Sequence, residues 1–331
     1  MSTATTTRYL PFLVTAEGGL ESRTNYQGEH VEGGVLDFAT TEDAIKASGL
    51  DYDIVKGSLT TSWLDDNGVG YGEVEGYSSL LKVQNGQTTV LPATVGSNQA
   101  IFQNLPVFAT VDTACGAAGA RWVSARSLKG GLGMQLHAKL PDAVNVGGFD
   151  PIDSFIKVTN WHDGSGSLEL AVMNYRRVCT NGLHAITQGN VIRMRHTSRA
   201  DLKDLEIDRL FATVEQSNRE LAVAGERMLN TDLTEGQMAY TIAQLFPYND
   251  RMSVKARNNV TRAREGVYNA FFNDTQDGIR DTAWGGYQAF VEYADWGTTA
   301  TKGDTQRAER QLTGTHDKTK QRAFEAFMAL A

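Results

Sequence analysis

The stretch SFIKVTNWHDGSGSLELAVMNYRRVC, residues 154–179, decides the fold class. From Leu168 to Met173, large aliphatic side chains alternate with Glu169 and Ala171, which is the period-2 pattern of a strand with one strongly buried face. The preceding SFIKVTNW run is also rich in strand-forming residues, and the HDGSGS segment between the two runs contains Asp-Gly, a pair that favours hairpin turns. This stretch therefore predicts an antiparallel hairpin in which Lys157 and other polar residues share the face opposite Ile156.

A second hairpin is predicted just upstream, where RWVSARSL and MQLHAKL flank the glycine-rich segment KGGLG. Before it, DYDIVKGSL, GYSSLLKV and TTVLPATV indicate further strands, with QNGQ as a turn. After Arg199 the apolar spacing changes to three or four residues, which is typical of helices. The sequence therefore predicts an α+β fold, with a hairpin-rich antiparallel sheet over about 50–180 and a mainly helical C-terminal half.

The helical half begins with an apolar stripe from Ile207 to Met228, for which Thr197 or Ser198 is the expected N-terminal cap. Thr234 and Gln237 form a capping-box pattern for a second helix, and three more helices are expected beyond it. Because the stripe is nearly heptad, we predict self-association through it, with packing inside one chain as the competing interpretation.

Three regions follow from these patterns. Residues 1–40 are predicted to form an N-terminal arm, 41–199 a β-rich core domain, and 200–331 a helical region packed on the core or used for oligomerisation. With 331 residues, 41% hydrophobic and 21% charged, the chain is globular in composition. It has no apolar run of the ~18 residues that a membrane span requires and no signal-peptide pattern at its start, so we expect a cytoplasmic protein of the host cell.

The charge is distributed unevenly along the chain. The formal net charge is −8, yet residues 121–199 hold ten Lys and Arg against five Asp and Glu, whereas both flanking regions are acidic. A basic segment interleaved with Trp122, Phe155, Trp161 and Tyr175 is typical of surfaces that hold single strands through phosphates and stacked bases.

Two groups of cations are candidate nucleic-acid contacts. One group follows the predicted hairpins and the segment before the first long helix, and the other lies on the helix expected after Asn249, where five cations occur within fourteen residues without an acid. The competing interpretation is a solvated face whose long side chains surround a core. The candidate residues are Arg121, Arg126, Lys129, Lys139, Lys157, Arg176, Arg177, Arg193, Arg195, Arg199, Arg251, Lys255 and Arg262.

No catalytic, metal or cofactor site is predicted. Cys179, His162 and His184 are the residue types of a nucleophile and its base. However, His162 and Asp163 lie where a hairpin must turn, and Cys179 continues an alternating strand. Both Cys115 and Cys179 are interpreted as buried thiols. The six histidines are scattered without metal-ligand spacing, and no glycine-rich run has the sequence of a phosphate loop.

Four segments carry a resemblance to a known family: GLDYDIVKGSL, VTNWHDGSGSLELAVMNYRRVCTNGL, IRMRHT and DTAWGGYQAFVEYADW. Over roughly residues 41–328 the chain resembles the phage/plasmid-like protein family, a laterally transferred group that carries a domain of unknown function. The resemblance implies a phage, prophage or plasmid source and no established activity. Such elements commonly encode single-strand annealing proteins, whose hairpin-rich sheet with a helix behind it is similar in outline.

These observations lead to one hypothesis and one alternative. The hypothesis is a non-enzymatic, oligomeric factor that binds single-stranded DNA or RNA in replication or recombination of the mobile element. The alternative is a protein-binding scaffold or an anti-defence factor of a phage.

Overall fold

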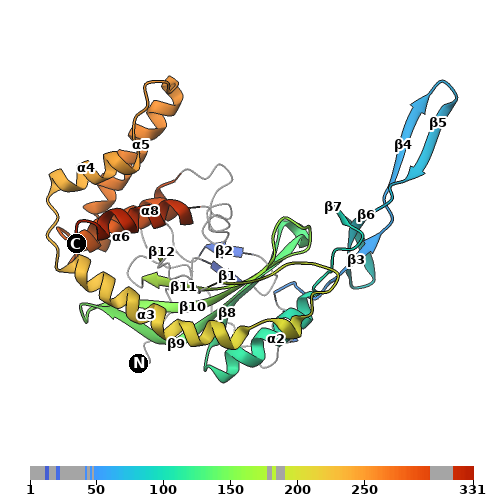
Figure 1. The fold of residues 1–331 in the computed structure, drawn as a ribbon, viewed down its shortest axis with the longest axis horizontal. Coiled ribbons are helices and arrows are strands. Elements are labelled where there is room, and N and C mark those ends of the chain that lie inside the picture. Colours follow the sequence, from blue (N-terminus) through green and yellow to red (C-terminus); the bar gives the residue numbers. More distant parts are fainter. Residues whose placement is uncertain are drawn as a thin grey trace.

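The computed structural model is a crescent whose middle is one antiparallel sheet (Figure 1). A slender hairpin projects from one end of the crescent, and helix α5 projects from the other. The structure describes residues 12–14, 20–22, 42, 45–46, 48–176, 181–183, 191–298 and 316–331. The predicted N-terminal arm is described only at the short paired strands β1 (Phe12–Val14) and β2 (Leu20–Ser22).

The central sheet confirms the two predicted hairpins. Its strand order is β12-β11-β10-β9-β8, and β13 also pairs with β11. At the β10–β11 turn Gly164 has φ +75°, a conformation that favours glycine. The bounds are β8 (Arg121–Leu128), β9 (Gly133–Val146), β10 (Asp150–Trp161), β11 (Leu168–Arg176), β12 (Asn181–Leu183) and β13 (Val191–Met194).

Two helices, α2 (Asn104–Ala117) and the first part of α3 (Ile207–Leu229), cover one face of this sheet (Figure 1). Alternate residues of the strands, such as Ile156 and Val158, are buried with them in one apolar core. Helix α2 was not predicted, because its residues are apolar or small almost all round and leave no helical stripe. Helix α3 begins at Ile207 and not after Thr197 or Ser198, so the prediction of that cap was wrong.

The second half of α3 belongs to a helical core at the other end of the sheet. Its other helices are α4 (Glu235–Leu245), α5 (Val254–Phe271), α6 (Ala283–Glu292), which continues as a π-turn (Tyr293–Gly297), and α8 (Asp317–Met328). The predicted capping box of Thr234 and Gln237 starts α4. The α+β class with a mainly helical C-terminal half is thereby confirmed.

The apolar stripe of α3 is covered by its own chain. Leu210, Leu221 and Met228 are buried, Leu210 against the sheet and the other two in the helical core. Gly225 allows the close approach, because a Cβ there would lie 2.7 Å from Cγ2 of Val146. Packing within one chain therefore accounts for the stripe, and self-association loses this support.

A second, small sheet stands beside the central one. Its order is β3-β6-β7, formed by β3 (Asp53–Gly57), β6 (Tyr77–Gln84) and β7 (Gln87–Gly96). The predicted QNGQ turn joins β6 to β7, with positive φ at Asn85 and Gly86. Between β3 and β6 the chain leaves this sheet as the hairpin of β4 (Thr60–Asp65) and β5 (Gly68–Glu73), here called the arm. This β4–β5 hairpin, which is distinct from the predicted N-terminal arm of residues 1–40, was not predicted from the sequence.

Candidate nucleic-acid interface

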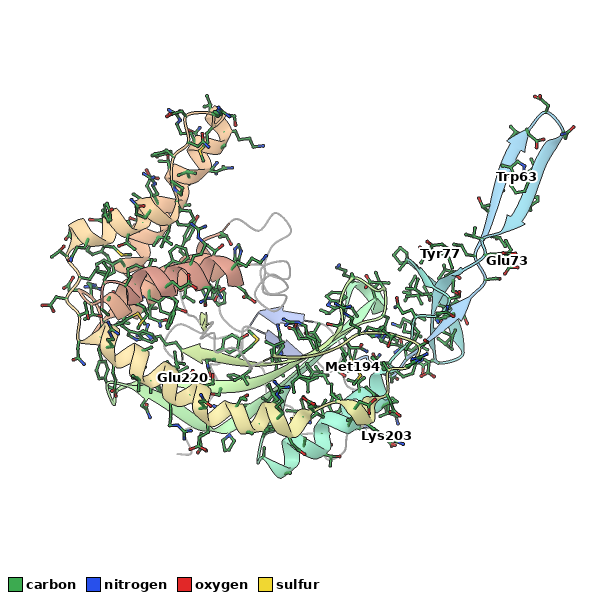
Figure 2. All side chains as sticks on the ribbon, in the orientation of Figure 1. Trp63, Glu73, Tyr77, Met194, Lys203 and Glu220 are labelled. Atoms are coloured by element: carbon green, nitrogen blue, oxygen red, sulfur yellow. The ribbon has the colours of Figure 1, made fainter. Side chains whose placement is uncertain are left out.

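An open groove of about 590 Å³ lies at the end of the central sheet, where the β10–β11 turn meets the segment that follows β13. Figure 2 labels Met194, the last residue of β13, at this end of the sheet. The turn contributes backbone and small side chains, and the later segment contributes cations and an imidazole. The residues on which the argument depends are Gly164, Gly166, Ser167, Arg193, Arg195 and His196.

The turn that forms one wall is held by its own hydrogen bonds. The Asp163 carboxylate accepts from the backbone N–H of Ser165 at 3.0 Å and from its hydroxyl at 2.6 Å. Gln99 donates from Nε2 to the carbonyl of His162 at 2.8 Å, and a Cβ on Gly164 would lie 2.8 Å from Gln99 Oε1. The prediction of a turn at Asp163 and Gly164 is confirmed, and both these local bonds and the sequence-distant contact with Gln99 fix this wall.

Two arginines on alternate residues form the opposite wall. Arg193 donates to Glu169 at 2.8 Å, and the same carboxylate lies 3.5 Å from Lys157 Nζ, so one acid is shared between two cations. Arg195 is exposed and makes no hydrogen bond or ion pair with any residue that the structure describes. Arg199, also exposed, follows on the same segment. This wall therefore carries excess positive charge beside a small-residue turn.

Lys129 and Trp161 extend the positive surface beyond the groove. The Lys129 ammonium lies 4.8 Å from the centre of a Trp161 ring, a cation–π contact. The indole lies against glycine backbone, since a Cβ on Gly166 would be 2.4 Å from Trp161 Cδ1 and one on Gly133 2.8 Å from Cε3. Because Gly166 also lines the groove, the indole connects Lys129 to it.

Three of the predicted contacts have structural partners instead. Arg176 is buried and donates from Nε to both oxygens of Asp150 at 2.8 Å. Lys157 is buried beside Glu169, and Lys139 pairs with Asp153 at 2.9 Å. The expectation that Arg176 contacts phosphate is wrong for this fold, because that would leave Asp150 as an unpaired buried charge. Lys157 is likewise unavailable.

The remaining candidates fall into two sets. Arg121 and Arg126 lie on the edge strand β8, but the structure does not describe their side chains. Arg177 lies outside the described residues. Arg251, Lys255 and Arg262 are exposed on and just before α5, at the opposite end of the crescent (Figure 1). The groove and α5 are therefore separate positive surfaces.

His162 belongs to the core and not to a reactive cluster. It is fully buried, and its Nε2 lies 3.1 Å from Asn104 Oδ1. Since the Asn104 amide donates to the carbonyl of Leu50, its oxygen accepts and the imidazole donates. Burial, with a smaller effect of His196, lowers the pKa of His162 to about 4. Burial also lowers the pKa of His196, which lines the groove.

The two other members of the considered catalytic cluster, Cys179 and His184, lie outside the described residues. The prediction that Cys115 is a buried thiol is confirmed, and burial raises its pKa to about 12. Within the described part of the chain, no group of His, Cys, Asp and Glu is arranged to hold a metal ion, and no helix is long and apolar enough to cross a membrane.

Sequence reasoning missed how Gln99, Gly166 and His196 meet. The IRMRHT segment is the available signal, because its arginines alternate in a short strand and its histidine follows directly. Gln99 lies more than sixty residues from the turn that it holds, and no local pattern marks it.

A family model described as a domain of unknown function (DUF932) matches residues 93–321, about two-thirds of the chain. The matched region includes the central sheet, the groove and nearly all of the helical half. The arm lies before it. Comparison with curated proteins and with solved structures finds no match.

Proposed function

The chain belongs to this family of unknown function, and we propose that it is a non-enzymatic protein that binds single-stranded nucleic acid along the groove at the end of the central sheet. The observation that carries the proposal is the pair Arg193 and Arg195 in the lining of one open groove, with Lys129 held over the Trp161 indole that packs against Gly166 of the same groove. Cations of this kind neutralise phosphates, and binding releases counterions from the strand.

The shape of the groove supports a single strand as the ligand. Gly164, Gly166 and Ser167 place no large side chain on one wall, so a sugar–phosphate backbone could approach the peptide N–H groups there. Trp161 supplies an aromatic side chain at the rim for a neighbouring base. The chain as a whole carries −8, which confines anion binding to such local surfaces.

The resemblance to phage- and plasmid-borne proteins supports a role in replication or recombination of a mobile element. A sheet with helices on one face is also the outline of single-strand annealing proteins, an analogy of fold and not of site. The alternative, a protein-binding scaffold or anti-defence factor, has its own support in the acidic arm with its exposed apolar residues.

The test is the salt dependence of binding to a long oligo(dT) strand. Lys129→Gln with Arg195→Gln should weaken binding and lower the slope of log K against log salt by about 1.4, since each single-strand phosphate contact contributes roughly 0.7. Lys203→Gln is the matched control, because Lys203 is an exposed cation just before α3 that does not line the groove. Its slope should equal that of the wild type.

Two results would contradict the proposal. The first is absence of wild-type binding at low salt. The second is an unchanged slope in the double variant, in which case α5 becomes the better candidate surface. Capture of host partners with and without nuclease distinguishes nucleic-acid binding from the protein-binding alternative, because a protein partner is retained after nuclease treatment.

A further inference from the structure

The arm exposes an apolar face that its own chain does not cover. All six residues of β4 are exposed, and Leu64, Val69 and Tyr71 are 80%, 60% and 78% exposed. The strand register pairs Leu64 with Val69 and Ser62 with Tyr71, so these apolar side chains share one face of the ribbon. A two-stranded hairpin is at best marginally stable alone, and an exposed apolar ribbon face marks an interaction site.

The other face of the arm shows that the ribbon is built to keep its shape. Trp63 lies opposite Gly70, and a Cβ on Gly70 would be 2.4 Å from the indole Cε2. Gly70 and Gly72 alternate along β5 and leave room for this one large ring, since a Cβ on Gly72 would also lie 3.1 Å from Trp63 Cζ3. Figure 2 labels Trp63 on the arm. The indole N–H donates to Asp65 at 3.3 Å, and Asp65 also accepts from the backbone N–H of Asn67 at 2.8 Å.

The charge of the arm disfavours nucleic acid as its partner. Residues 57–81 contain Asp65, Asp66, Glu73 and Glu75 and no Lys or Arg. A phosphate backbone would be repelled by this ribbon. Two arms packed face to face would also bring like charges together. The chemistry that fits is a basic surface with an apolar element.

Helix α5 has that chemistry at the other end of the crescent. Residues 251–264 hold five cations and no acid, and Arg251, Lys255 and Arg257 are exposed without an ion pair to any described residue. Val254, between two of these cations, is 77% exposed. Arg264 is engaged within the chain, donating to the carbonyl of Phe246 and lying over the Tyr248 ring.

The positive charge at the N-terminal end of α5 destabilises this helix. Helix N-termini favour acids because of the exposed N–H groups there, yet this one has no acid in its first turn and has Arg251 and Lys255 beside it. An acidic partner at this end would compensate the arrangement. The arm and α5 project from opposite ends of one molecule, so the arm meets an α5 only in a second copy (Figure 1).

We propose that the arm of one copy docks on α5 of the next, joining the chains head to tail. The acids of the arm would face Arg251, Lys255 and Arg257, while Leu64 and Tyr71 would cover Val254. A head-to-tail contact leaves one free arm and one free α5 on every pair, so further copies can add until the chain of copies closes as a ring or grows as an open filament. This proposal does not depend on nucleic-acid binding in the groove.

The test is the mass of the full chain by light scattering across a concentration series. The wild type should form species larger than 36.1 kDa. Arg251→Glu with Lys255→Glu should raise the concentration needed for assembly at least tenfold, and acids at a helix N-terminus keep that variant folded. Asp66→Lys with Glu73→Lys should do the same from the arm and leaves Asp65 to hold the turn. Lys203→Glu is the control and should assemble like the wild type.

Two combinations make the test specific for a head-to-tail contact. Placing both charge reversals in one chain should restore assembly. Mixing Leu64→Ser/Tyr71→Ser with Arg251→Glu/Lys255→Glu should give a heterodimer of two chains and nothing larger, because one intact arm then meets one intact helix. Arm-to-arm pairing would give no such heterodimer.

A wild type that stays at 36.1 kDa at every concentration would overturn the proposal. Assembly that survives both arm variants would also overturn it. If the α5 variant instead loses oligo(dT) binding and assembles normally, α5 is a nucleic-acid surface and the arm has another partner.

Discussion

The hairpin of β10 and β11 and the arm of β4 and β5 are both antiparallel ribbons with glycine near the turn, yet one is buried and the other is exposed. Ten of the twelve residues of β10 are buried, charged ones included, whereas every residue of β4 is exposed. Charge on the buried hairpin therefore serves the fold, as Arg176 does. The exposed apolar side chains of the arm contribute to no core, which is why we propose recognition as their role.

The same contrast separates the arginines of the basic segment. Arg176 and Arg193 both pair with a carboxylate at 2.8 Å, but the Arg176 side chain is 2% exposed and the Arg193 side chain 60%. Arg176 also donates to the carbonyl of Thr275, and its partner Asp150 accepts from the Trp284 indole at 2.8 Å. This buried group ties the sheet to the helical core.

The largest expected effect comes from breaking that tie. Arg176→Ala should lower the free energy of unfolding by about 3–5 kcal/mol, because it leaves Asp150 as a buried unpaired charge. Arg193→Ala removes the exposed pair and should cost less than about 1 kcal/mol. Denaturant unfolding of both variants measures the difference. Equal losses in the two variants would show that the buried Arg176–Asp150 pair stabilises the fold no more than the exposed Arg193–Glu169 pair does.

The sequence predicted the part of the fold that local patterns encode. Period-2 alternation and Asp-Gly located the β10–β11 hairpin, and the capping box of Thr234 located α4. The arm was missed because GVGYGE reads as a glycine-rich loop until its register with Trp63 is known. The burial of Arg176 could not be predicted either, since its partners, Asp150 and the carbonyl of Thr275, are brought to it by tertiary packing.

The second largest expected effect is the loss of stability on acidification that the burial of His162 causes. Burial lowers the pKa of His162 from 6.5 to about 4, so between these values the unfolded chain binds a proton at this site that the folded chain does not. Stability is therefore lost as pH falls from about 6.5 towards 4, by up to about 3 kcal/mol. Of the titratable neighbours, His196 lowers the pKa of His162 further and Asp163 raises it, both by less than burial lowers it.

The measurement is the free energy of unfolding of the wild type and of His162→Gln at several pH values. The variant should be less stable at neutral pH and should lose less stability on acidification, because its side chain does not titrate. Parallel pH profiles for the two proteins would count against a buried neutral imidazole at this position.

The smallest expected effect on stability comes from the arm, and that is what makes it informative. Leu64→Ser with Tyr71→Ser should change the free energy of unfolding by less than about 0.5 kcal/mol, because both side chains are exposed and contribute to no core. Backbone amides of β4 should exchange with solvent far faster than those of β10 in the isolated monomer, since a two-stranded ribbon opens locally. Hydrogen exchange at a concentration that permits assembly should then slow at β4 and in the first turns of α5 together, and neither change should occur in the Leu64→Ser/Tyr71→Ser variant. Protection at β4 that is independent of concentration would mean that the arm is stabilised within its own chain.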